Sequence, residues 1–144
     1  MNTSTYTDAF SDIATRNFKR WMDALEFNAR PETIAKLYHG NGTLHPTFEI
    51  RKFEGPKDIV SYFEGFLQHT PTVTIESERI SPLSETAYLH EGIYVFVIDR
   101  NLTVRARFTF IWTRQNETGK EDWKILHHHS SRIPLPKRCP NCMT

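Results

Sequence analysis

The chain has 144 residues, of which 38% are hydrophobic and 24% charged, a size typical of one compact domain. Lys and Arg number 18 against 17 Asp and Glu, a net charge of +1, so no overall field draws the protein to nucleic acid or to an anionic membrane. Its apolar runs fall far short of the ~20 residues that cross a bilayer, and its first residues are polar. We therefore expect a cytoplasmic protein with no nucleic-acid partner and no membrane partner.

The two cysteines lie close together near the end of the sequence. Cys139 and Cys142 form a C-x-x-C pair, which leaves the rest of the chain without a disulfide framework. A redox or zinc role for the pair is an alternative, but a lone pair at a chain end favours a solvated segment. We expect one domain over residues 1–136 and a flexible C-terminal tail over residues 137–144.

Three helices are predicted in the first half. Residues 8–27 carry apolar side chains at spacings of three and four, which is typical of an amphipathic helix. A short second helix is expected to begin at Pro31 and to end at Gly40 and Gly42. A third begins near residues 55–56 and runs to about His69. Between the last two, Pro46 leaves room only for a short strand or loop.

After Pro71 the apolar residues recur at every second position, which predicts β-strands. Five strands are expected in succession: 73–76, 86–90, 92–99, 102–113 and 123–131. Residues 99–101 and 115–120 have the composition of tight turns, so neighbouring strands should pair antiparallel. Helices followed by such a run indicate an α+β fold, with the helices packed on one face of the sheet.

The last predicted strand carries three histidines and two serines. By strand alternation, His127, His129 and Ser131 share a face with the apolar Trp123 and Ile125, and that face should point inward. Buried imidazoles and hydroxyls of this kind most often satisfy one another by hydrogen bonds.

A bulge in this strand would reverse the alternation, because one extra residue exchanges the two faces of a strand. Ser130 would then point inward in place of Ser131.

In the preceding strand, Arg107 lies on the face opposite the apolar residues. On that face its side chain is either solvated or reaches an acidic ligand.

A metal site is an alternative use of the histidines. Two His at positions i and i+2 of a strand can bind zinc with a third ligand, which His45 or His90 would have to supply. We expect no metal cofactor, with zinc or manganese as the alternative.

Five segments taken in order identify a resemblance: 43–47 (TLHPT), 59–67 (IVSYFEGFL), 92–96 (GIYVF), 105–110 (RARFTF) and 123–131, ending in HHHSS. Over about residues 18–136 the chain resembles proteins related to the association domain of calcium/calmodulin-dependent kinase, and within them the iota-class carbonic anhydrases. The resemblance implies a cone-shaped fold of the nuclear-transport-factor-like superfamily. In that fold, N-terminal helices pack into a strongly curved antiparallel sheet around a pocket.

The resemblance further implies reversible hydration of carbon dioxide to bicarbonate, without a metal. In such enzymes a threonine of an L-x-P-T segment, a tyrosine and a serine of the H-H-S-S strand hold bicarbonate. The matching positions here are Thr47, Tyr62 and Ser131, with His129 adjacent.

Other residues could share or replace these roles. Tyr94 is a second candidate for the tyrosine and Ser130 for the serine, and His127 and Arg107 are further expected substrate contacts. The chain departs from the pattern at His45, where relatives often have leucine.

Two other functions remain open. A non-catalytic oligomerisation or small-ligand-binding module has the same fold, and at least a homodimer is expected. An isomerase would need a carboxylate in the pocket, and Glu91 and Asp99 are the available strand carboxylates.

Overall fold

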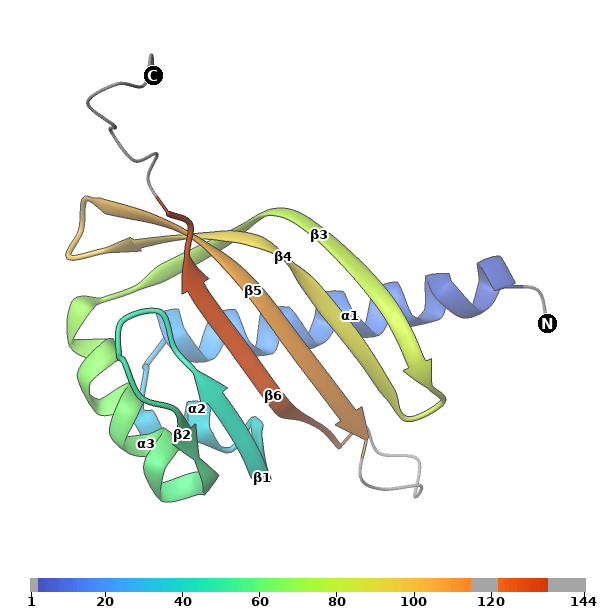
Figure 1. Cartoon of the computed structure of the whole chain (residues 1–144), viewed down its shortest axis with the longest axis horizontal. Helices are drawn as coiled ribbons and strands as arrows, with labels where there is room; N and C mark the ends of the chain where they lie inside the picture. Colours follow the sequence, from blue (N-terminus) through green and yellow to red (C-terminus); the bar gives the residue numbers. More distant parts are fainter. Residues whose placement is uncertain (1–2, 115–121, 135–144) are drawn as a thin grey trace, which may run out of the picture.

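The computed structural model describes residues 3–114 and 122–134. The described chain forms three α-helices, a short 3-10 helix and six strands (Figure 1). In chain order these are α1 (Thr3–Glu26), α2 (Pro31–Ala35), β1 (Tyr38–His45), β2 (Phe53–Glu54), α3 (Gly55–Phe66), η1 (Leu67–His69), β3 (Thr72–Ser84), β4 (Ala87–Ile98), β5 (Leu102–Arg114) and β6 (Trp123–Arg132). The predicted turn at 115–120 and the predicted tail at 137–144 lie outside the described residues.

The strands form one sheet in the order β2-β1-β6-β5-β4-β3. Strands β3 to β6 pair antiparallel with their sequence neighbours, as predicted. Figure 1 shows α1 crossing one face of the curved sheet, while α2 and α3 lie beside β1 and β2 at one end. The α+β prediction is confirmed. No helix among the described residues combines the length and apolar character needed to span a membrane.

Three predictions about the strands are wrong. The sheet is mixed, because β1 pairs parallel with β6, which lies far away in the sequence. Gly40 and Gly42 belong to β1 and do not follow the second helix directly. Residues 86–90 and 92–99 belong to one strand, β4, and Gly92 lies inside it.

Gly92 is needed where β3 bulges against β4. The pairing shifts between Ile75 and Ser77, and a Cβ on Gly92 would lie 2.0 Å from the carbonyl oxygen of Ser77. The glycine marks a close approach of two backbones within the ladder.

A second bulge reverses the faces of β6. Ile111 of β5 pairs with His127, but the next residue, Trp112, pairs with Ile125, so Leu126 is an extra residue in β6. On the two sides of this bulge the buried positions are Trp123, Ile125, His128 and Ser130. The prediction that residues 127, 129 and 131 face inward is therefore wrong, and the bulged alternative with Ser130 inside is confirmed.

Aromatic side chains fill the space between α1 and the sheet. The ring of Trp21 on α1 lies parallel to that of Tyr94 on β4, with centroids 6.1 Å apart, and meets Phe110 and His128 edge-on. Large rings of this kind bury much apolar area. They hold α1 over the middle of the sheet.

Replacing Gly92 with alanine should destabilise the fold by about 3 kcal/mol or more, because the new methyl group must displace the β3 backbone. Gly65→Ala is the matched control: Gly65 lies in α3 with open space around it, and alanine should stabilise the helix by about 0.5–1 kcal/mol. Urea unfolding of both variants measures the difference. Equal stabilities for the two would contradict the close contact at Gly92.

Candidate functional site

A small cavity lies between the helices and the inner face of the sheet. Its walls are mostly aromatic and aliphatic, with hydroxyl and imidazole groups at one end; the lining residues are Trp21, Leu44, Pro46, Thr47, Tyr62, Phe63, Phe66, Tyr94, Phe96, His128 and Ser130. The centre of a water-sized molecule can occupy about 10 Å³ of it, roughly what a single water needs. The cavity is therefore far too small for a drug-sized ligand.

A chain of hydrogen bonds runs from α1 through β1, β6 and β4 to this cavity. Trp21 Nε1 donates to Tyr38 Oη at 3.2 Å, and Tyr38 Oη lies 2.8 Å from His128 Nδ1. On the other side of the ring, His128 Nε2 is 3.1 Å from Tyr94 Oη, which donates to Ser130 Oγ at 2.6 Å. Ser130 completes the chain by hydrogen-bonding Thr47 Oγ1. We call these six residues the polar chain.

The bonds from Trp21 to Tyr38 and from Tyr94 to Ser130 constrain the protons of the polar chain. The indole of Trp21 only donates, so Tyr38 accepts this bond and its own proton is available for His128 Nδ1. Neutral His128 then carries its proton on Nε2 and donates to Tyr94. Tyr94 donates to Ser130, and in the bond between Ser130 and Thr47 either hydroxyl can donate.

Burial keeps the members of this chain uncharged. Desolvation lowers the pKa of His128 well below its ordinary value, and repulsion from His127 and His129 adds to this. Desolvation raises the pKa of both Tyr38 and Tyr94. The imidazole and phenol groups therefore act as neutral donors and acceptors near pH 7.

Tyr62 contributes a phenol from α3. It lines the cavity and packs against Phe53, Phe63 and Phe66. Its hydroxyl has no hydrogen-bond partner among the described residues, in contrast to Tyr94. Burial raises its pKa, and Glu49 adds to the shift, so the group stays protonated and is available to donate to a ligand.

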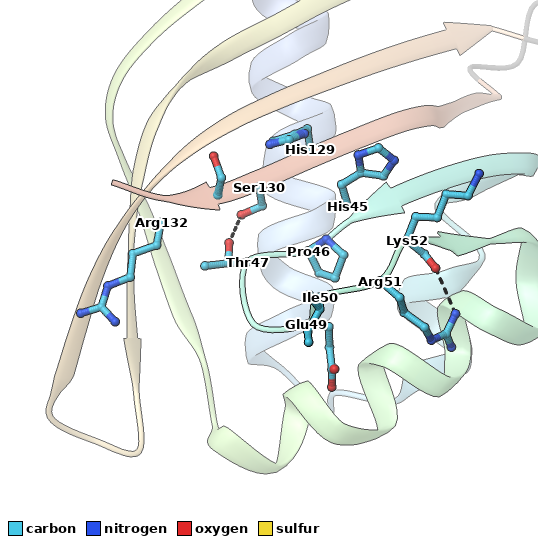
Figure 2. A pocket seen from close by; sticks show the side chains of 11 residues that line it. His45, Pro46, Thr47, Glu49, Ile50, Arg51, Lys52, His129, Ser130 and Arg132 are labelled. Carbon is cyan, nitrogen blue, oxygen red and sulfur yellow. Dashed lines mark hydrogen bonds between the residues drawn. The ribbon is translucent and has the colours of Figure 1, made fainter. Parts of the chain in front are cut away.

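An open groove borders the cavity at the ends of β1 and β6 (Figure 2). The groove holds about 370 Å³ and shares Pro46, Thr47 and Ser130 with the cavity. Figure 2 shows the Thr47 and Ser130 hydroxyls pointing toward each other between the loop after β1 and the end of β6. This pair forms the boundary between the cavity and solvent.

The groove is lined by several charged side chains. Arg51 pairs with Asp58, and Lys52 with Glu54. Arg132 also lines the groove and makes no ion pair within the described residues. Its guanidinium can attract a small anion to the groove, whereas the Glu49 carboxylate, which also lines the groove, repels one.

Four of the candidate residues come together at the cavity: Thr47, Tyr62, Tyr94 and Ser130. The other four lie elsewhere. His127, His129 and Ser131 lie on the outer face of β6, as the bulge requires, although His129 and Ser131 line the groove. Arg107 is exposed on the outer face of β5, in a depression with Glu78 and Glu91.

Sequence reasoning missed His128, Tyr38 and Trp21 as parts of the site. His128 alternates with the residues that regular strand alternation places on the inner face, and the bulged alternative was considered only for the two serines. Tyr38 and Trp21 fall in predicted helices, where the pattern indicates core residues. The parallel pairing of β1 with β6 brings Tyr38 to His128, and Trp21 donates to Tyr38.

The two candidates for a third metal ligand lie in different places. His90 is buried in the core edge-on to Phe108, with Nε2 3.4 Å from a carboxylate oxygen of Glu78. His45 lies beside His127 and His129, and one ligand nitrogen of each lies within 4.8 Å of the others.

Lowering the pH from 7 to 5 should destabilise the protein. The folded state holds the pKa of His128 below its ordinary value near ~6.5. Below that pH the unfolded chain therefore binds a proton at this residue, and the folded protein does not. Each pH unit below ~6.5 then costs up to about 1.4 kcal/mol from this residue. Urea unfolding at pH 7, 6 and 5 measures this. A flat profile would contradict a neutral buried His128.

The chain has relatives of known structure. A protein from Xanthomonas campestris, described as a calcium/calmodulin-dependent protein kinase II association domain, is 31% identical, with a TM-score of 0.77 over 85% of this chain and 86% of that one. An NTF2-like protein of unknown function from Pseudomonas putida is 18% identical, with a TM-score of 0.71 over 87% of each chain. A nuclear transport factor 2 (NTF2-like) superfamily protein from Salmonella enterica is 19% identical, with a TM-score of 0.69 over 98% of this chain and 99% of that one.

These comparisons show the cone fold and the family. No curated protein sequence matches the chain. The model of the calcium/calmodulin-dependent protein kinase II association domain matches residues 11–134, nearly all of the described chain. The protein therefore belongs to the calcium/calmodulin-dependent protein kinase II association-domain family.

Proposed function

We propose that the cavity binds a molecule of a few non-hydrogen atoms, and that the protein hydrates carbon dioxide reversibly to bicarbonate there. The observation that carries the proposal is the end of the polar chain: Ser130 and Thr47 meet where the apolar cavity borders the groove. The resemblance to iota-class carbonic anhydrases supports the choice of substrate.

The cavity suits the size and polarity of this substrate. Aromatic rings of Phe63, Phe66 and Phe96 line it, and such walls accept an uncharged molecule more readily than an ion. Its small volume excludes large substrates, and the adjoining groove provides the additional room that carbon dioxide and water need. The groove beyond Thr47 supplies water.

Two hydroxyl protons are available to the reacting oxygen atoms. When Ser130 donates to Thr47, the Thr47 hydroxyl can donate to a ligand, and the Tyr62 hydroxyl has no partner among the described residues. When water attacks the carbon, negative charge develops on the carbon dioxide oxygens, and fixed donors stabilise it. In this proposal Ser130 takes the role that the resemblance gives to Ser131.

The reaction also releases a proton. Attack of water on carbon dioxide forms one C–O bond, and one of the two water protons must leave to give bicarbonate. The Thr47 and Ser130 hydroxyls lie at the boundary to the groove, where His129 is exposed. Burial and His45 lower the pKa of His129, so its imidazole is neutral near pH 7 and can accept this proton.

Stopped-flow measurement of carbon dioxide hydration tests the proposal. Ser130→Ala removes the group that orders Thr47, and we expect a loss of roughly 100-fold in kcat, the size of losing one fixed donor. Ser131→Ala is the matched control, because it deletes a hydroxyl one residue away on the outer face and should keep full activity.

Two results would overturn this assignment. A folded wild-type protein that is inactive both with and without added zinc or manganese would exclude hydration. Alternatively, loss of activity in Ser131→Ala with full activity in Ser130→Ala would place the reaction on the outer face. Circular dichroism of each variant separates loss of activity from loss of fold.

Assembly is a second candidate function, and the outer face of the sheet favours it. Apolar side chains of β4 and β5 point away from the core and are only half-buried: Leu89, Ile93, Val95 and Ile111. Such a face on a sheet suggests burial against another chain. The name of the family, an association domain, supports a second copy of this chain as the partner.

Light scattering during gel filtration tests assembly. We expect at least a dimer at micromolar concentration, and Leu89→Glu should shift it toward monomer, because Leu89 lies opposite Ile111 in the apolar part of the face. Thr103→Glu, at an exposed position of β5, is the control and should leave the mass unchanged. A monomeric wild-type protein would contradict the assembly proposal.

A further inference from the structure

We propose that His45, His127 and His129 form a binding site for a divalent transition-metal ion, zinc above all, on the outer face of the sheet. The three imidazoles come from two neighbouring strands, and one nitrogen of each lies within 4.8 Å of the other two. The site is separate from the cavity, because His128 and Ser130 point to the opposite face of β6.

The backbone places the three rings on one face. In the parallel pairing of β1 with β6, His45 lies opposite His129, and Thr43 lies opposite His127. His127 and His129 are two residues apart and so share a face. The rings of His45 and His127 have centroids 5.1 Å apart, and those of His45 and His129 are 5.6 Å apart.

Thr43 orients one of the ligands. Its Oγ1 lies 2.7 Å from Nδ1 of His127. When Nδ1 donates its proton to this hydroxyl, the lone pair of Nε2 is free for a metal. Metal-binding histidines usually have such a partner on their second nitrogen, which fixes the tautomer and the ring.

The three donors are all imidazole nitrogens, and this determines which metals suit the site. Neutral imidazole nitrogens suit zinc, copper and nickel, whereas magnesium and calcium require oxygen ligands.

Zinc binding requires only side-chain movement of the three histidines. Zinc bonds imidazole nitrogen at about 2.0–2.1 Å, so tetrahedral ligand atoms lie about 3.3 Å apart. Rotation of the imidazoles can close the remaining gap, since His129 is exposed and His127 half-buried. His45 and His129 line the groove, so the fourth position of a three-histidine site would be open to a water molecule there.

A calorimetric titration of chelator-treated protein with zinc chloride tests the site. The protein should carry Cys139→Ser and Cys142→Ser, because the C-x-x-C pair is itself a possible zinc ligand. We expect one zinc ion per chain. Cobalt(II) serves as a second probe, and its intense visible absorption reports tetrahedral binding.

Two variants identify the ligands. His45→Leu removes one ligand and should weaken zinc binding by at least roughly 10-fold. Even the loss of a residue that only hydrogen-bonds to a metal ligand typically lowers metal affinity about 10–100-fold. His69→Gln is the control: this exposed histidine pairs with Asp99, away from the cluster, and its loss should not affect zinc affinity.

The outcomes separate this site from the cavity. Ser130→Ala should bind zinc as tightly as the parent protein, whatever its activity toward carbon dioxide. Absence of zinc binding in the parent protein, or equal affinity in His45→Leu, would overturn the proposed metal site. Neither result depends on whether the cavity hydrates carbon dioxide.

Discussion

One extra residue in β6 determines which side chains the protein keeps inside and which it exposes. Without the bulge at Leu126, strand alternation would continue from Trp123 and Ile125 to His127 and His129. With it, His128 and Ser130 enter the core, and their neighbours point to the outer surface. A strand with an apolar first half and a polar second half thereby serves two faces, one buried and one open.

The buried half is stable because each of its polar groups has a partner. His128 lies between two phenols, and Trp21, Tyr38 and Tyr94 extend the chain of bonds on both sides. Unpaired, an imidazole in this core would cost several kcal/mol in lost hydration. Paired, it joins α1, β1, β4 and β6 in one network, so the same bonds that satisfy the core also fix the side chains at the cavity.

Sequence reasoning succeeded where structure is local. The spacing of apolar residues located α1 and α3, and the resemblance led to Thr47 and Tyr62, which both line the cavity. It failed where the cause is non-local. The parallel pairing of β1 with β6 depends on contacts far apart in the chain, and the role of Gly92 depends on a bulge in the opposite strand. Strand alternation leaves the choice between Ser130 and Ser131 open, because a bulge has no unique residue signature.

The groups at the end of the polar chain give the cavity a chemical preference. Tyr94 donates to Ser130, and the Ser130 and Thr47 hydroxyls at this end both carry protons that can be donated. A guest at that end meets hydrogen-bond donors and aromatic walls, with no carboxylate among the lining residues. Oxygen-bearing acceptors are favoured over ammonium or other cations of the same size, because the cavity holds no negative group to balance a buried positive charge.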